Sequence, residues 1–242
     1  MTKLKDIPRI TASPRVRSDQ FYVYSYTAMT KRSRAILATC LLAATLFGTA
    51  ACAGISTAQT TTLPYSDNFD NPQSGWEITS DLSGDARYEN GRMRILVKNE
   101  NITIWSTAGK VFANGVYTID AQPIGGPQDN GFGVLFRVAD RKNFYHFEIS
   151  SDGYWRAGLT RDGKWMNWSD WMQHPAIKTG GESNRIRIAM NGPKLDFFVN
   201  DQPISSREDA TISQGDIGVM ALTVIDQPGT DVVFDNASVT EK

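Results

Sequence analysis

The sequence predicts an all-β protein: a single antiparallel β-sandwich of two sheets, preceded by a signal peptide or anchor helix. From Tyr65 onward, apolar residues recur with period two and almost never at helical spacing, which is typical of strands with one buried face. Gly, Asn, Asp and Pro interrupt these runs at hairpin spacing. Residues 64–242 are enough chain to bury a core without disulfides, so we expect one sandwich domain there.

Residues 1–28 and 53–63, which flank a predicted signal sequence, are not expected to form a core. Residues 1–28 contain no apolar stretch long enough for one, so they are either a disordered extension or a misassigned start, with translation beginning at Met29. Residues 53–63 are uncharged and rich in Ser and Thr, which predicts a flexible tether in front of the sandwich.

A signal sequence occupies residues 29–52. Residues 31–34 read Lys-Arg-Ser-Arg, and residues 35–51 carry no charge, which is the order of a basic n-region and an apolar h-region. The segment ends Thr-Ala-Ala-Cys, which resembles the lipobox of bacterial lipoproteins, although Thr49 stands where Leu is usual. The resemblance implies that Cys52 becomes the acylated first residue of the mature protein.

Two alternatives to lipidation are also compatible with the sequence of residues 29–52. An ordinary signal peptidase would cut after Ala53 or Ala58. Alternatively, the 17 uncharged residues from 35 to 51 remain as an uncleaved anchor at the lower limit for spanning a bilayer. All three outcomes place the sandwich outside the cytoplasm, and lipidation or an uncleaved helix would also attach it to a membrane.

Charge and cysteine content exclude several classes of function. Residues 1–52 hold eight Lys/Arg and two Asp/Glu, so the rest of the chain holds 17 basic and 24 acidic residues, about −7 in all. A surface of that sign repels phosphate, so we expect no nucleic-acid partner. Both cysteines, Cys40 and Cys52, lie in the leader, which rules out a disulfide, a thiolate metal site or a Cys nucleophile in the sandwich.

Strict alternation predicts the strands of the sandwich. The clearest patterns lie in residues 92–98, 117–122, 185–190 and 194–199, and roughly a dozen strands are expected in all. Three turns set the register between residues 131 and 168. They are the four residues 139–142, the three residues 151–153 and the two-residue turn Asp162-Gly163.

Pairing outward from these turns sorts the side chains of residues 131–168 onto two faces. The apolar face is expected to join the core and holds Val134, Phe136, Tyr145, Phe147, Ile149, Trp155, Ala157, Leu159, Met166 and Trp168. The opposite face holds Arg137, Phe144, His146, Glu148, Arg156, Thr160, Trp165 and Asn167. On this second face, Glu148 is expected directly opposite Arg156.

The ordered motifs from Tyr65 to Val239 resemble the concanavalin A-like lectin/glucanase superfamily, near its laminin-G-like and 3-keto-disaccharide hydrolase groups. The motifs are Asp67-Asn68-Phe69, Gly75-Trp76, residues 131–137 (GFGVLFR), 143–147 (NFYHF), 184–188 (NRIRI), 197–200 (FFVN), 215–219 (GDIGV) and 234–236 (FDN). The resemblance implies two packed, curved sheets in jelly-roll order.

The second face is the predicted ligand site. Trp165 projects from it with Phe144 beside it, and flat rings stack well on the apolar faces of sugars. Five hydrogen-bonding residues surround these rings: Arg137, His146, Glu148, Arg156 and Asn167. We therefore expect a carbohydrate platform. The alternatives are a face covered by a loop, and a solvated face on which Glu148 and Arg156 form an ordinary ion pair.

Catalysis is less favoured by the sequence than binding. Glycosidases need two carboxylates across the scissile bond, and glucanases of the superfamily carry a Glu-x-Asp-x-x-Glu strand. Here Glu148 has no carboxylate partner on its face, because Asp152 falls in a turn. We expect a non-catalytic carbohydrate-binding lipoprotein. The alternatives are a glycoside-cleaving enzyme with Glu148 and His146 as acid and base, and a structural or adhesion module without a small ligand.

A structural Ca²⁺ ion is the only cofactor that the resemblance suggests, because many relatives hold one near their joined termini. Asp67, Asp70 and Asp235 would converge if the first and last strands pair. The alternative for Asp70-Asn71-Pro72 is ordinary turn chemistry.

Overall fold

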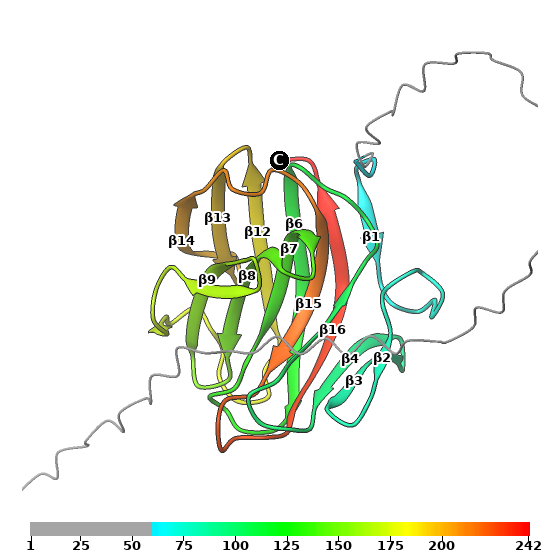
Figure 1. The fold of residues 1–242 in the computed structure, drawn as a ribbon, viewed down its shortest axis with the longest axis vertical. Helices are drawn as coiled ribbons and strands as arrows, with labels where there is room; N and C mark the ends of the chain where they lie inside the picture. The colour runs from blue at the N-terminus through cyan, green and yellow to red at the C-terminus, as the bar shows by residue number, and fades with distance from the viewer. Residues whose placement is uncertain (1–59) are drawn as a thin grey trace, which may run out of the picture.

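The computed structural model describes residues 60–242, which form a β-sandwich of two antiparallel sheets (Figure 1). The predicted extension, the signal peptide, Cys52 and most of the tether lie outside the described residues. Within residues 60–242, no helix has the length and apolar character needed to cross a membrane. The prediction of an all-β, two-sheet sandwich is confirmed.

Sheet A has nine strands and sheet B has seven. Sheet A runs in the order β14 (Gln202–Glu208), β13 (Lys194–Val199), β12 (Asn184–Asn191), β6 (Gly115–Gly125), β16 (Thr230–Thr240), β4 (Arg92–Val97), β3 (Gly84–Glu89) and β2 (Thr79–Ser80), with β1 (Tyr65–Asp67) also paired to β16. Sheet B runs in the order β10 (Lys164–Asn167), β9 (Tyr154–Arg161), β8 (Asn143–Ser150), β7 (Gly131–Asp140), β15 (Asp216–Leu222) and β5 (Thr103–Thr107), with β11 (Met172–Gln173) paired to β9.

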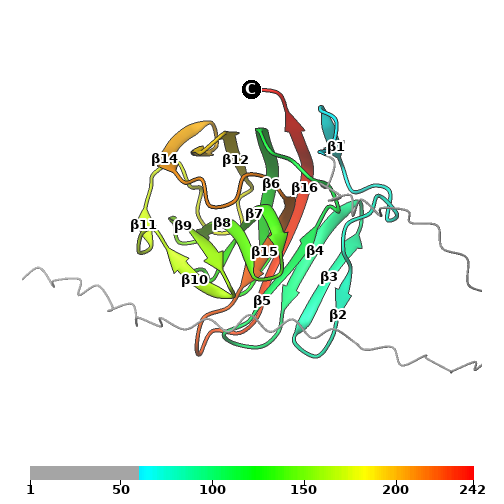
Figure 2. The ribbon, with the colours of Figure 1, turned by 45° about the horizontal axis from the view of Figure 1, so that its top comes forward.

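Strands far apart in the sequence lie side by side in both sheets. β6 pairs with β16 in sheet A, and β7 pairs with β15 in sheet B (Figures 1 and 2). This order is the jelly-roll arrangement that the resemblance implied. The core lies between the sheets, where Phe147 of sheet B stacks on Phe197 of sheet A with ring centroids 5.2 Å apart.

The predicted register of β7 to β10 is confirmed. Phe136 pairs with Tyr145, Phe147 with Ala157, and Glu148 with Arg156. Trp165 pairs with Thr160, which places both on the face turned away from sheet A. The predicted inward side chains face sheet A, although Met166 is 41% exposed because β10 extends past the edge of the core.

The turn between β7 and β8 differs from the prediction. The sequence suggested four turn residues, 139–142, but β7 continues to Asp140, which pairs with Asn143. A register shift between Phe136 and Asp140 takes up the additional residues, and Arg137 within it has a φ of 48°. A bulge of this kind redirects a side chain, so Arg137 leaves the face on which alternation had placed it.

Candidate functional site

The candidate site lies on the outer face of sheet B, the face turned away from sheet A. β8 supplies Phe144, His146 and Glu148, and β9 supplies Arg156. β10 adds Trp165 at the sheet edge. Because successive strand residues point to opposite faces, the buried inward residues between them hold these side chains on the outer side.

An ionic cluster occupies the centre of this face. Arg156 donates from Nε and Nη2 to Glu148 Oε2, at 3.1 and 2.6 Å. The other carboxylate oxygen, Oε1, lies 2.7 Å from His146 Nδ1, a close polar contact although its geometry is not that of a hydrogen bond. His146 and Glu148 are fully buried, and Arg156 is only 4% exposed. These three residues are called the His146–Glu148–Arg156 cluster below.

Burial and charge set the protonation of this cluster. Burial alone would raise the pKa of Glu148, but the charge of Arg156 and the contact with His146 outweigh it and hold the pKa below its usual value. Burial lowers the pKa of His146, and the neighbouring carboxylate offsets this only in part. Glu148 is therefore charged and His146 neutral near pH 7. The neutral imidazole of His146 carries its proton on Nδ1, because an Nδ1 lone pair would face the carboxylate oxygen of Glu148.

Two tryptophans cover the cluster. The ring of Trp165 stacks on the imidazole of His146, with centroids 3.9 Å apart and an interplanar angle of 28°. The guanidinium of Arg156 lies 4.6 Å from the centre of the Trp171 ring and 6.0 Å from that of Trp165. Both indoles are half-buried. Trp171 comes from the loop after β10. The alternative in which a loop covers this face is therefore correct for the part of the face that lies under Trp171.

Most of the predicted platform residues are covered. Phe144 is fully buried and packs edge-on between Trp105 and Trp165, so its ring is not presented to a ligand. Among the predicted residues of this face, Trp165 is half-buried and Asn167 is exposed. Asn167 Oδ1 accepts a hydrogen bond of 2.8 Å from Trp165 Nε1. The accessible part of the predicted platform is therefore small and centred on Trp165.

Arg137 does not belong to this face, which corrects the prediction. Its guanidinium donates to the carbonyl oxygens of Ala113 (3.1 and 2.8 Å), Ile212 (3.0 Å) and Gly192 (2.7 Å). The residue is 1% exposed. Burial lowers the pKa of Arg137, and a guanidinium stays protonated in proteins. Arg137 therefore ties together three connecting segments and offers nothing to a ligand.

Three further residues, Trp105, Trp171 and Met220, complete the outer face and were not predicted from the sequence. Trp105 and Met220 meet there because β5 pairs with β15, a contact between distant segments. Trp171 lies against Gly131 of β7. A Cβ added to Gly131 would lie only 3.0 Å from the Trp171 ring. Gly131 at this outward position was the feature of the sequence that could have predicted the contact, because a residue without a side chain leaves room for a covering ring.

The three calcium candidates do not converge, although β1 pairs with β16 as expected. Asp67 accepts from Trp76 Nε1 at 3.0 Å and from the Phe69 amide at 2.8 Å. Asp70 accepts from Asn68, and Asp235 from the Asn236 amide. Residues 60–242 contain no group of three or more His, Cys, Asp or Glu side chains that could hold a metal. In the described residues, each of these three carboxylates accepts a hydrogen bond from a group close to it in a turn or in the packed interior.

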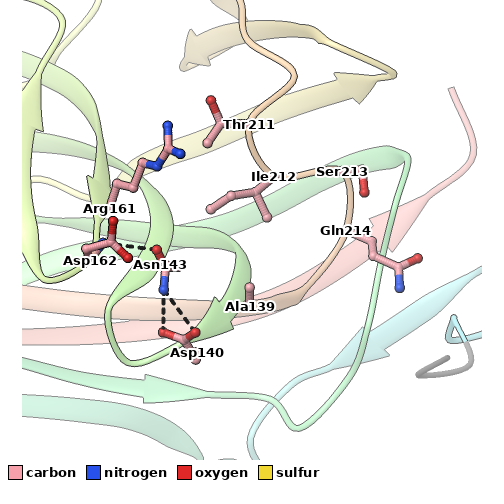
Figure 3. Close-up of a pocket in the computed structure, with 9 residues that line it drawn as sticks. All are labelled: Ala139, Asp140, Asn143, Arg161, Asp162, Thr211, Ile212, Ser213 and Gln214. Carbon is pink, nitrogen blue, oxygen red and sulfur yellow. Dashed lines mark hydrogen bonds between the residues drawn. The ribbon is translucent and has the colours of Figure 1, made fainter. Parts of the chain in front are cut away.

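A pocket lined by other residues lies away from the ionic cluster (Figure 3). It has a volume of about 510 Å³ and is lined by Ala139, Asp140, Asn143, Arg161, Asp162, Thr211, Ile212, Ser213 and Gln214. Asn143 joins two of its turns, because it donates to Asp140 and accepts from the Asp162 amide. None of the predicted platform residues lines this pocket, so it does not extend the candidate site.

Solved structures with the same fold include proteins that act on carbohydrates. A glycosidic hydrolase has a TM-score of 0.57 at 10% identity, covering 75% of this chain and 97% of its own. The Bacillus licheniformis β-glucanase has a TM-score of 0.55 at 9% identity, covering 76% and 100%. A Bacillus subtilis protein of unknown function with a galectin-like fold has a TM-score of 0.56 at 12% identity, covering 73% and 94%. At these identities the likeness establishes the fold alone.

Comparison with curated proteins gives no match. Comparison with protein families matches residues 66–240, the whole sandwich apart from its ends, to the 3-keto-alpha-glucoside-1,2-lyase-like domain. This confirms the resemblance to the 3-keto-disaccharide hydrolase group of the concanavalin A-like superfamily. The chain belongs to the family of 3-keto-alpha-glucoside-1,2-lyase-like domains.

Proposed function

We propose that the sandwich binds a carbohydrate on the outer face of sheet B and does so without chemistry. The observation that carries the proposal is the support beneath Trp165: its indole is half-buried and stacks on His146. Glu148 and Arg156 hold that imidazole in place. A ring fixed in this way loses little conformational entropy when a sugar stacks on it.

The charge state of Glu148 favours binding over two-carboxylate hydrolysis. A glycosidase needs a general acid that stays protonated near neutral pH, hence a carboxyl with a raised pKa. The pKa of Glu148 is lowered instead, and both of its oxygens face cluster partners. The outward positions of β8, β9 and β10 offer no second carboxylate.

Replacing Trp165 with alanine is expected to weaken carbohydrate binding about tenfold or more, because the stacking surface is removed; tenfold corresponds to about 1.4 kcal/mol. The measurement is isothermal titration of the purified chain with laminari-oligosaccharides, cello-oligosaccharides, sucrose and trehalose. The matched control is Leu82→Ala, which removes a 92% exposed apolar side chain from the turn before β3 and should leave the affinity unchanged. Equal affinity of Trp165→Ala and the unaltered chain would contradict the proposal, and no binding to any of the sugars would favour the structural or adhesion module.

A lyase is the second candidate, favoured by one observation at the same site. Neutral His146 has Nδ1 against a carboxylate and no partner for Nε2 among the described residues, which is how a general base is prepared. In a 3-keto-glucoside the ketone acidifies the hydrogen on C2. Transfer of that proton to Nε2 would form a C1=C2 bond as the C1–O bond breaks, and the leaving oxygen would take up a proton. Release of the leaving group from a 3-keto-glucoside, absent in His146→Phe, would establish this reading over binding alone.

The proposal includes attachment to the outer surface of a membrane through acylated Cys52, with the sandwich outside the cytoplasm. Its support is the basic, apolar and small-residue order of residues 31–52. Cells expressing the chain with an alkyne-labelled fatty acid are expected to label it, and Cys52→Ser is expected to remove the label. Cys40→Ser is the matched control and should keep it. A label that survives Cys52→Ser would exclude this anchor.

A further inference from the structure

We infer that the pocket in Figure 3 binds a neutral ligand rich in hydroxyl groups, such as one sugar unit or a polyol, at a second site separate from the outer face of sheet B. The pocket lies among residues 139–143, 161–162 and 211–214, and is called the polar pocket below. The inference goes beyond the proposed function, and neither of the two sites depends on the other.

One wall of the polar pocket is formed by residues 211–214, and buried side chains hold it from the interior. The Tyr145 hydroxyl donates to Asp209 Oδ1 at 2.7 Å and accepts from the Ile212 amide at 3.0 Å. Arg137 Nη1 donates to the Ile212 carbonyl oxygen at 3.0 Å. Because Tyr145 and Arg137 are both buried, the main chain of this wall is fixed at both polar groups of Ile212.

The other wall is formed by two hairpin turns that are joined to each other. Asn143 Nδ2 donates to both carboxylate oxygens of Asp140, at 3.0 and 2.9 Å, and Asn143 Oδ1 accepts from the Asp162 amide at 3.0 Å. The Gly163 amide donates to the Lys142 carbonyl oxygen at 3.0 Å. A pocket with both walls held in this way is formed before a ligand arrives, which lowers the entropic cost of binding.

The polar pocket presents hydrogen-bonding side chains that the fold does not use. These side chains line the pocket and make no hydrogen bond or ion pair with any residue from 60 to 242: Arg161, Asp162, Thr211, Ser213 and Gln214. The pocket volume of about 510 Å³ lies within the range of about 300–1,000 Å³ that small-ligand sites occupy. Five polar side chains are therefore available to a ligand of that size.

The available groups indicate the chemical class of the ligand. Arg161 only donates hydrogen bonds, Asp162 only accepts them, and the two hydroxyl groups and the amide do both. A ligand hydroxyl also donates and accepts, so a ligand with several hydroxyls can satisfy all of these groups. Ile212 adds an apolar surface to the lining, which suits the C–H groups of a sugar ring or polyol chain.

The charge of the lining argues against an ion as the ligand. The lining holds two carboxylates, Asp140 and Asp162, and one guanidinium, Arg161, so its net negative charge disfavours an anion. A cation would find only the carboxylate of Asp162 free, because Asn143 already donates to both oxygens of Asp140. No group of three or more metal-ligating side chains lies among residues 60–242.

Strand geometry separates the polar pocket from the outer-face site. Arg161 follows Leu159 by two residues on β9, so both side chains leave the side of the strand that faces sheet A. Trp165 pairs with Thr160 and leaves the opposite side. The two sites therefore open on different sides of sheet B, and binding at each can be measured separately.

The test follows the amide signals of the isotope-labelled, purified chain by nuclear magnetic resonance during titration with glucose, galactose and mannitol. At least one of these neutral probes is expected to shift the signals of Asp162 and residues 211–214, and the concentration dependence gives the affinity. Acetate and phosphate are the anionic comparisons. No shift with any of the three neutral probes, or shifts with acetate or phosphate alone, would overturn the inference.

Two variants measure the contribution of the lining. Arg161→Met removes a charged donor and is expected to weaken binding about tenfold, and Ser213→Ala about threefold. Both residues are exposed, so the substitutions should leave the fold intact. Lys178→Met removes an exposed cation outside the pocket and is the matched control, which should keep full affinity. Full affinity in both pocket variants would show that these groups bind nothing.

Trp165→Ala separates this inference from the proposed function. The variant removes the stacking ring of the outer face and should leave the shifts of residues 211–214 unchanged. If those shifts disappear as well, the polar pocket is not a separate site and the inference is wrong, although the proposed function stands. If residues 211–214 respond while Trp165→Ala changes the binding of no sugar, the inference stands and the proposed function fails.

Discussion

Replacing Arg137 with methionine is expected to lower the free energy of unfolding by about 3 kcal/mol. The guanidinium makes four hydrogen bonds to three main-chain carbonyl oxygens, and methionine removes all four, of which the bond to Ile212 is fully buried and the others are part-buried. Loss of the buried bond costs about 1–3 kcal/mol, the part-buried bonds add to it, and relief of the buried positive charge offsets part of the sum. Urea denaturation followed by far-UV circular dichroism measures the change.

Arg161→Met is the matched control for this substitution. Arg161 is exposed and lines the polar pocket (Figure 3), so removing its charge should change the unfolding free energy by no more than about 0.5 kcal/mol. Arg137→Lys should fall between the two, because a single ammonium group cannot reach carbonyls on three segments. Coincident denaturation midpoints for Arg137→Met and Arg161→Met would refute the role given to Arg137.

Replacing Glu148 with alanine is expected to destabilise the fold by about 3–5 kcal/mol. The substitution leaves the buried guanidinium of Arg156 without its carboxylate and removes the group beside His146 Nδ1. A buried ion left unpaired costs more than the pair contributes when intact. Thermal and urea unfolding measure the loss, and Glu182→Ala, at an exposed position before β12, is the control.

Acid titration provides a second measurement on the same pair. Because the folded pKa of Glu148 lies below its ordinary value of 4.5, its charged form stabilises the fold above that pH. This stabilisation is lost as the pH falls through the folded pKa, so the unaltered chain should lose stability in acid more steeply than Glu148→Ala. Parallel pH profiles for the two chains would show that Glu148 is not held charged in the fold.

The register of β8, β9 and β10 was predictable because local chemistry determines it. Asp162-Gly163 closes a two-residue hairpin, with φ of 52° and 75° at the two positions. Once that turn and the turn at 151–153 are placed, alternation assigns each side chain to a face, and Glu148 and Arg156 must meet. Pairing and sidedness follow from short-range rules of this kind.

Burial on the outer face could not be predicted in the same way. Alternation says that His146 and Phe144 point away from sheet A, but it does not say what lies over them. The covering rings come from the loop that carries Trp171 and from β5, which carries Trp105. The predicted position of Arg137 was wrong for a different reason. Arg137 lies in a bulge with a positive φ, and the sequence carries no reliable signal for a non-glycine residue in that conformation.

The pairing of β1 with β16 has a consequence for how the domain is connected to other parts of a polypeptide. Tyr65 lies opposite Val239, so the chain enters and leaves the sandwich at neighbouring points (Figures 1 and 2). A domain with adjoining ends can be spliced into a surface loop of a host protein, or circularly permuted through a short linker, without crossing its own strands.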